Sequence, residues 1–158
     1  MPECSLREFE QTDADWLRAW YQADQKGMET LMGMNLPQES TYMAACNAIF
    51  DAVIQGQARF WMLDREKQPM GFFLMTDFAP DNSTARVHIY VDPEQRRYSL
   101  KAAKSIEAAL TSTLVEIGMK QVIASQPRHQ RGARALAKRM GFTEIPEVIL
   151  TKELQHGV

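Results

Sequence analysis

The stretch 91-VDPEQRRYSLKAA-103 combines three kinds of local structure. It begins as the apolar end of a strand, turns at a proline and continues as the first turn of a helix, with cations between. A turn between a strand and a helix often binds phosphate, but it usually does so through glycine, and this stretch has no glycine. Three interpretations follow: an anion site built from side chains, a degenerate anion site, or a solvated helix start.

Two amphipathic helices are predicted before this stretch, after a short first strand at residues 5–11. Thr12 and Asp15 form a candidate capping pair for the first helix. The second helix is expected to start from a cap at Asn35 or Ser40. Apolar residues recur at helical spacing in both, namely Trp16, Leu17, Trp20 and Tyr21 in the first and Tyr42, Cys46, Ile49, Phe50, Val53 and Ile54 in the second.

Residues 27–36, GMETLMGMNL, separate the two helices and are rich in methionine, with two glycines. This composition predicts a pliable apolar segment and not a regular element. Two uses are open for it: filling the core, or facing a substrate as a loop.

Three strand candidates follow at 58–64, 70–78 and 84–91. Their connectors are rich in turn residues and have the length of hairpin loops, so the three strands predict an antiparallel meander. In the last of them, alternation puts Arg86, His88 and Tyr90 on one face of the sheet.

The segments after the turn within residues 91–103 alternate between helix and strand. A long helix ends at Gly118, and a strand at 121–125, a basic helix at 130–140 and a strand at 147–154 follow. The full order is β-α-α-β-β-β-α-β-α-β. We therefore expect one α/β domain of the α+β kind over residues 1–158, with a mixed, mostly antiparallel sheet and helices on both faces.

The charges of the 158 residues are unevenly distributed. Residues 1–95 carry 7 Lys and Arg against 15 Asp and Glu, and residues 96–158 carry 11 against 5, so the net charge of -2 hides a basic second part. A local anionic ligand or a solvated basic face would each explain this asymmetry. Nucleic-acid binding is disfavoured, because no run of aromatic residues accompanies the cations.

The two cysteines, Cys4 and Cys46, lack the spacing of a metal site or a disulfide framework, so we expect two ordinary thiols and no metal. The acidic start of the sequence does not resemble a secretory signal, and no segment is apolar over the length of a membrane span. A cytoplasmic protein without a membrane partner is the expectation.

The element order, with HIYVDPEQRR at 88–97 and QRGARALAKRMGF at 130–142, resembles the GCN5-related N-acetyltransferase (GNAT) superfamily over nearly the whole chain. In that family, a strand ending in Val-x-Pro leads to a glycine-containing turn that holds the pyrophosphate of coenzyme A. Here Ser99 and Lys101 stand where glycines are expected. A register two residues later puts Ala103 in the second small-residue place and leaves Lys101 in the first.

The resemblance implies acetyl-CoA as co-substrate and a set of residues that would bind it: Val91, Arg96, Arg97, Tyr98, Ser99, Leu100, Lys101, Gln130 and Arg131. Arginine and lysine side chains would replace the glycines by charge-assisted hydrogen bonds. Gln130 stands for an asparagine of the family pattern, and Ala137 stands for its tyrosine.

The function implied is acetyl transfer to a primary amine of a small molecule or a protein. His88 is the best-placed titrating group for removing the proton of the amine, with a structural histidine as the alternative. Tyr98 is a candidate for protonating the departing thiolate, a step that Ala137 cannot perform. The alternative function is a noncatalytic GNAT-fold protein that binds acyl-CoA or a protein partner. Family members commonly form homodimers.

Overall fold

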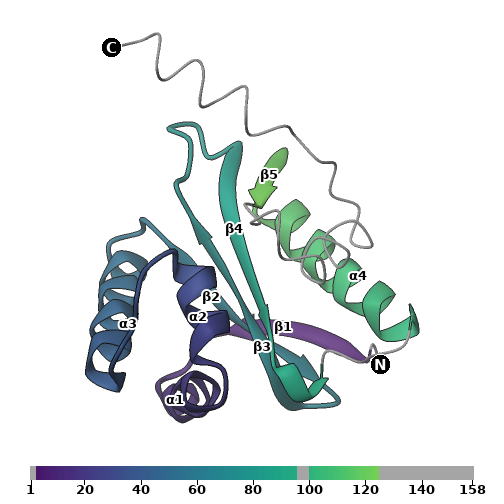
Figure 1. Cartoon of the computed structure of the whole chain (residues 1–158). Helices are drawn as coiled ribbons and strands as arrows, with labels where there is room; N and C mark the ends of the chain where they lie inside the picture. The colour runs from purple at the N-terminus through teal and green to yellow at the C-terminus, as the bar shows by residue number, and fades with distance from the viewer. Residues whose placement is uncertain (1–2, 96–99, 125–158) are drawn as a thin grey trace, which may run out of the picture. The chain divides into compact units, whose positions relative to one another are not determined.

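The computed structural model describes residues 3–95 and 100–124 (Figure 1). These residues contain one five-stranded sheet in the order β1-β2-β3-β4-β5. The first three pairings are antiparallel and β4 pairs with β5 in parallel, so the predicted mixed, mostly antiparallel sheet is confirmed. The strands are β1 (Cys4–Glu8), β2 (Arg59–Arg65), β3 (Gln68–Thr76), β4 (Thr84–Val91) and β5 (Gln121–Ala124).

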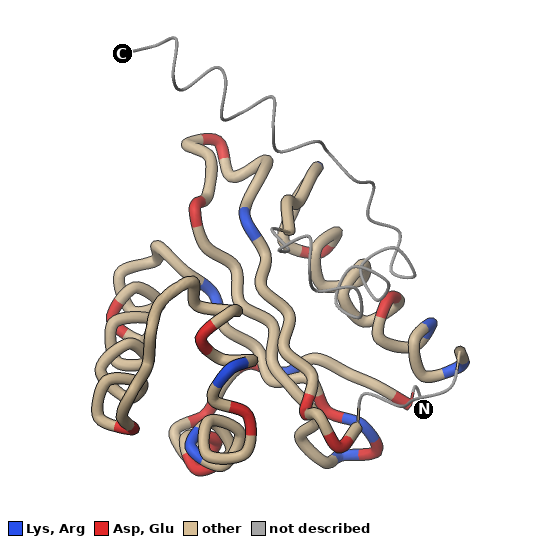
Figure 2. The backbone as a smooth tube through the Cα atoms, viewed as in Figure 1, with Lys and Arg blue, Asp and Glu red and all other residues tan. Residues whose placement is uncertain are grey.

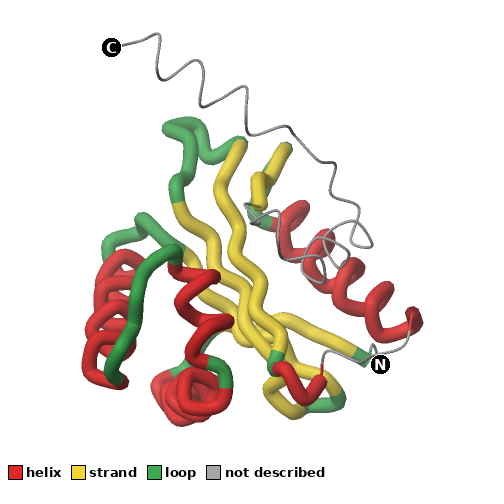
Figure 3. The backbone as a smooth tube through the Cα atoms, in the orientation of Figure 1, coloured by secondary structure: helices red, strands yellow, loops and turns green. Residues whose placement is uncertain are grey.

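Helices cover both faces of this sheet, as predicted (Figure 3). Three helices before the meander lie on one face, and α4 lies on the other (Figure 1). The helices are α1 (Ala14–Ala23), α2 (Gln25–Met32), α3 (Glu39–Ile54) and α4 (Leu100–Glu116), with short 3-10 turns η1 (Gln11–Asp13) and η2 (Pro93–Gln95).

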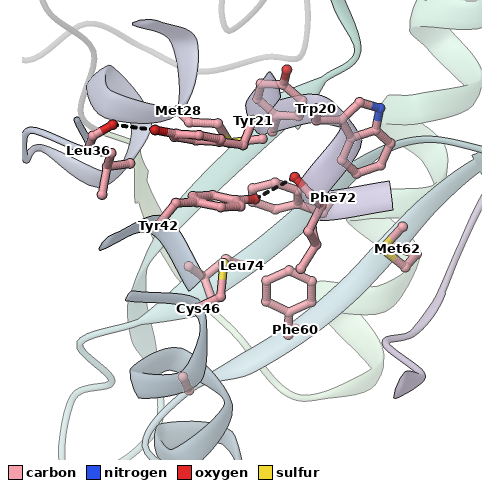
Figure 4. Packing of buried hydrophobic residues seen from close by; sticks show 13 residues of the cluster. Trp20, Tyr21, Met28, Leu36, Tyr42, Cys46, Phe60, Met62, Phe72 and Leu74 are labelled. Atoms are coloured by element: carbon pink, nitrogen blue, oxygen red, sulfur yellow. Dashed lines mark hydrogen bonds between the residues drawn. The ribbon is translucent and has the colours of Figure 1, made fainter. Parts of the chain in front are cut away.

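The alternation of the strands divides the core between these two faces. On the face of α1 to α3, the rings of Phe60, Phe72 and Tyr90 stack with centroids 5.1 and 5.3 Å apart. Trp20 of α1 packs on this row, with its ring centroid 6.2 Å from that of Phe72 and 5.6 Å from that of Tyr90. Figure 4 shows Trp20, Phe60 and Phe72 among the packed side chains. On the other face, α4 contributes buried Ala102, Ala103, Ile106 and Leu110.

The prediction of an irregular methionine-rich segment was wrong, because most of it is the helix α2. The carboxylate of Asp24 accepts a hydrogen bond from the backbone N–H of Gly27 at 3.2 Å and caps the helix start. Gly33 ends the helix in the left-handed conformation, with φ of 65°. Met28 is fully buried, so part of the segment does fill the core.

The predicted helix caps were also wrong. Asp13, and not Thr12 or Asp15, precedes α1, and its carboxylate is occupied by Arg7 and by the backbone N–H of Glu10. The N-cap of α3 is Gln38, and not Asn35 or Ser40. Gln38 has a β conformation and directly precedes the first helical residue, Glu39, and its side chain makes no capping hydrogen bond. Both helices therefore depend on packing of their apolar faces more than on a polar cap.

The described residues, 3–95 and 100–124, fall in one compact unit. The predicted helix at 130–140 and the predicted strand at 147–154 lie outside the described residues, so the single domain over 1–158 stays a prediction. Among the described residues, no helix has both the length and the apolar character needed to cross a membrane.

Candidate active site

His88 lies on the face of β4 that α1 to α3 cover, as the alternation of the strand predicts. Its Nε2 atom is 3.1 Å from the Oγ1 atom of Thr76 on β3. Burial lowers the pKa of the imidazole below its ordinary value, and the nearby Arg86 guanidinium lowers it further. His88 is therefore a neutral ring at physiological pH, able both to donate and to accept a proton.

A pocket of about 310 Å³ opens beside His88, between α2, α3 and the sheet. Its lining is aliphatic, aromatic or sulfur-containing except at His88 and Thr76, and no charged residue contributes to it. The lining residues are Leu17, Leu31, Met32, Met34, Tyr42, Ala45, Cys46, Ala48, Ile49, Phe50, Phe60, Phe72, Leu74, Thr76 and His88.

The two other polar groups in this lining are uncharged. The hydroxyl of Tyr42 donates a hydrogen bond to the backbone carbonyl of Leu17 at 2.9 Å (Figure 4), and burial raises its pKa well above the ordinary value. Burial likewise raises the pKa of the Cys46 thiol. The pocket therefore presents a neutral apolar wall with one titrating group, His88, at physiological pH.

Two side-chain hydrogen bonds hold the end of β4 and the start of the turn that follows it at Asp92. The indole N–H of Trp20 donates to Asp92 at 3.1 Å, and the hydroxyl of Tyr90 donates to Asp24 at 3.0 Å. The backbone N–H of Asp92 also donates to the carbonyl of Met70 at 2.7 Å. The end of β4 and the first residues of the turn are thus held to α1 and β3.

The described part of the predicted coenzyme site consists of Val91, Leu100 and Lys101. The side chain of Val91 is buried, so only its backbone could serve a ligand. Leu100 is 64% exposed, and Lys101 is exposed at the second residue of α4. Arg96, Arg97, Tyr98, Ser99, Gln130 and Arg131 lie outside the described residues.

The start of α4 is cationic where a helix normally favours anions. Its first turn holds no acidic residue, and Lys101 and Lys104 are the second and fifth residues of the helix. Figure 2 shows blue segments at this end of α4. The positive end of the helix dipole adds to these charges instead of offsetting them. This end of the helix is therefore electrostatically suited to a bound anion. The burial of Ala102 and Ala103 turns both lysines toward solvent.

The sequence singled out His88 as a candidate, and that role stays a prediction, but the pocket that His88 lines was not predicted. Tyr42 and Cys46 share a face of α3, as their helical spacing predicts, but Thr76 comes from β3, and nothing in the sequence shows that these two elements meet at His88. Only the methionine-rich segment carried a signal, because a substrate-facing role was one of its two open uses. Its residues Met32 and Met34 do line the pocket.

The model of the GNAT acetyltransferase domain matches residues 4–143 of this sequence. This match covers most of the chain, and the chain belongs to the GNAT acetyltransferase family. The resemblance noted from the sequence is thereby confirmed. No curated protein matches the sequence.

Solved structures of acetyltransferases share the fold. One is the Salmonella typhimurium acetyl transferase that modifies the N-terminal serine of the 50S ribosomal subunit protein L7/L12, with 13% identity and a TM-score of 0.73 over 90% of this chain and 82% of that chain. Another is spermidine N-acetyltransferase from Vibrio cholerae in complex with CoA and spermine, with 14% identity and a TM-score of 0.72 over 91% and 83%. A further ribosomal L7/L12 alpha-N-protein acetyltransferase, in complex with coenzyme A, has 12% identity and a TM-score of 0.71 over 92% and 83%.

Proposed function

We propose that this protein transfers an acetyl group from acetyl-CoA to a primary amine by direct attack in a ternary complex. The observation that carries the proposal is a neutral His88 in the wall of a pocket on the sheet face, in a chain that belongs to the GNAT family. The fold that this chain shares with the acetyltransferases named above does not identify the acceptor. The acceptor must be inferred from the residues of this site.

His88 has the properties that the amine requires. An amine with an ordinary pKa near 10 is mostly protonated at neutral pH, and only its neutral form is a nucleophile. When Nε2–H of His88 donates to Thr76 Oγ1, Nδ1 is the nitrogen that accepts a proton from the amine. Thr76 is then the positioning residue that fixes the tautomer.

The described residues at the start of α4 fit the co-substrate. Lys101 and the helix end provide positive potential for a pyrophosphate, and the first turn carries no carboxylate that would repel it. We propose that Arg96, Arg97, Ser99, Leu100, Gln130 and Arg131 complete this site together with the backbone of Val91. Acetyl-CoA supplies the thioester carbonyl and a thiolate leaving group when bound.

Tyr98 is proposed as the group that gives a proton to the departing sulfur, because the family tyrosine is replaced by Ala137. The overall reaction is balanced: the protonated amine loses one proton before attack, and its nitrogen loses a second as the carbon–nitrogen bond forms and the carbon–sulfur bond breaks. The thiolate gains a proton in place of one of these two, and the other is released to solvent. A cytoplasmic location and a homodimer stay predictions.

The first experiment is thermal unfolding of the full chain with saturating acetyl-CoA. Ligand at a hundred times its dissociation constant adds about 2.7 kcal/mol, which raises the unfolding temperature of a protein of this size by roughly 5 to 10 °C. If millimolar acetyl-CoA leaves the unfolding temperature unchanged, coenzyme binding is wrong.

The second experiment separates an enzyme from a binder. Release of free thiol from acetyl-CoA is followed with a panel of primary amines, for the wild type and for His88→Gln. Loss of a general base typically lowers kcat/KM by about 10²- to 10⁴-fold. A rate unchanged by His88→Gln would remove His88 from the mechanism.

A noncatalytic acyl-CoA-binding protein is the second candidate. The replacement of glycine by Lys101 and of tyrosine by Ala137 favours it. In that case acetyl-CoA raises the unfolding temperature, but no amine of the panel releases thiol.

A further inference from the structure

The pocket beside His88 is selective by its chemistry as well as by its position. Fifteen residues line it, and no Asp, Glu, Lys or Arg is among them. We propose that the acceptor inserts an uncharged aliphatic or aromatic group into this pocket and presents its amine at the end formed by His88 and Thr76. The inference rests on the proposed function only in calling the ligand an acceptor.

Burial of charge argues against a polycationic acceptor. An ammonium group taken into an apolar pocket without a counter-ion loses its hydration and receives nothing in return. On α2, Glu29 already accepts a hydrogen bond from the backbone N–H of Leu36 at 2.8 Å, and Asp24 accepts from Gly27 and Tyr90. Neither carboxylate lines the pocket. A second or third ammonium of a polyamine would therefore remain unpaired there.

The size of the pocket limits the inserted group. Small-molecule pockets usually measure about 300 to 1,000 Å³, so a volume of about 310 Å³ holds one ring or a short alkyl chain. Met32 and Met34 form part of the wall, and their unbranched thioether chains adapt to different apolar shapes. We expect tolerance among apolar groups of this size and discrimination against charge.

The pocket reaches the surface, so a ligand can enter it. Met34 is 47% exposed and Ala48 is also exposed, and both contribute to the lining. Leu17, Tyr42 and Phe72 form the buried part of the same lining, and each is almost fully buried. Most of the lining is apolar, which suits an inserted hydrocarbon group.

The test compares 2-phenylethylamine with spermidine as acceptors of the full chain, and binding of 2-phenylethanol as a neutral, unreactive probe. We expect kcat/KM for 2-phenylethylamine to exceed that for spermidine by tenfold or more. Binding of 2-phenylethanol is followed by ligand-observed NMR, without acetyl-CoA.

The matched variants are Ala45→Trp and Ala44→Trp on α3. Ala45 lines the pocket, whereas its neighbour Ala44 is exposed and does not. Ala45→Trp is expected to abolish binding of 2-phenylethanol, and Ala44→Trp to preserve it. If Ala45→Trp no longer unfolds cooperatively, Ala45→Leu fills less of the pocket and replaces it, with an expected loss of severalfold in affinity.

The outcomes separate the two proposals. Faster acetylation of spermidine than of 2-phenylethylamine would overturn the apolar acceptor and leave acetyl transfer standing. Binding of 2-phenylethanol that depends on Ala45, with no thiol released by any amine, would support the apolar pocket and overturn the transferase. Equal binding of the probe to Ala45→Trp and Ala44→Trp would overturn the pocket as the binding site.

Discussion

His88 is a side chain whose acid–base behaviour follows from its surroundings. Burial and Arg86 lower its pKa below the ordinary value of 6.5. The unfolded chain therefore protonates the imidazole more readily than the folded protein does. The contribution of the neutral ring to the free energy of unfolding is lost as pH falls from about 6.5 through the lowered pKa. Above that window, folded and unfolded chains are both neutral at this position.

We predict that acid destabilises the wild type more than His88→Gln. Between about pH 7.5 and pH 5, the difference in the free energy of unfolding should move in favour of the variant, with a slope of at most about 1.4 kcal/mol per pH unit. Urea unfolding at several pH values measures this. Parallel pH profiles for the two proteins would mean that the imidazole titrates alike in both states.

Arg7 joins two nearly buried carboxylates at the edge strand β1. It makes two contacts of 2.8 Å with Asp13 and one of 2.8 Å with Asp64. The other oxygen of Asp64 is buried without a hydrogen-bond partner. Removal of the guanidinium would leave both carboxylates without their counter-charge.

We predict that Arg7→Met lowers the free energy of unfolding by on the order of 2 kcal/mol, less than for a fully buried pair because the Arg7 side chain is 36% exposed. Arg18→Met is the control, since its pair with Glu39 is exposed on both sides and should change stability by less than about 0.5 kcal/mol. Equal effects of the two substitutions in urea unfolding would refute the role of Arg7.

Single residues were predictable where one strand decides their place. The alternation of β4 placed His88 and Tyr90 on one face without any tertiary information. The partners of these side chains were not predictable, because Thr76 and Asp24 reach them through sheet register and helix packing. The lowered pKa of His88 depends first on burial, which helix packing on the sheet decides, so the sequence pattern alone could not reveal it.

At the scale of elements, α4 carries positive charge at its N-terminal end, where the helix dipole is already positive. Lys101 in the first turn is unfavourable for the helix but favourable for an anionic ligand. Lys101→Glu should therefore abolish binding of acetyl-CoA while raising the free energy of unfolding by about 0.3 to 1 kcal/mol. Thermal unfolding with and without ligand measures both effects.

Lys120→Glu is the matched control for this substitution, since Lys120 is exposed just before β5 and away from the helix start. It changes the net charge equally and should leave binding intact. Unchanged binding in Lys101→Glu would mean that Lys101 does not meet the phosphate.

Close packing of β3 on β4 depends on Gly71. A Cβ atom at this position would lie 1.9 Å from the carbonyl oxygen of Tyr90, and the backbone of β4 cannot yield as a side chain would. Gly71→Ala should lower the free energy of unfolding by about 3 kcal/mol. Gly56→Ala is the comparison: its Cβ meets nothing within 4 Å, and its φ of 76° costs only about 1 kcal/mol. Similar losses in urea unfolding would exclude the clash.

The elements themselves were largely predictable. The strand at 84–91 was placed as observed, and those at 58–64 and 70–78 were placed within two residues, because turn residues bound each of them. The helix α2 was missed, since Gly27 and Gly33 suggested irregular structure. Both glycines instead serve the helix ends, one beside the capping Asp24 and one in a left-handed turn.

Across the whole molecule, charge and apolar surface fall on different candidate sites. The residues from 96 onward carry the basic excess, whereas the pocket beside His88 has no charged lining. Salt should therefore weaken acetyl-CoA binding by roughly three- to tenfold between low and high ionic strength, and should leave binding of 2-phenylethanol unchanged or slightly stronger. Isothermal titration with acetyl-CoA and NMR with the alcohol measure the two affinities. Equal salt dependence of both would mean that they share one electrostatic environment.

The hydrogen bond from Trp20 to Asp92 has a spectroscopic consequence. The indole of Trp20 packs near Tyr90, Phe72 and Trp16 and donates to Asp92, the first residue after β4. Trp61 lies on the opposite face of the sheet, and Trp16 is 38% exposed. The fluorescence of Trp20 would respond to a ligand in the pocket beside His88 through Phe72, which lines that pocket, and to acetyl-CoA at the turn after β4 through Asp92. The protein thus carries an intrinsic optical probe, and a Trp16→Phe, Trp61→Phe background would isolate its emission and allow the order of ligand binding to be timed by stopped flow.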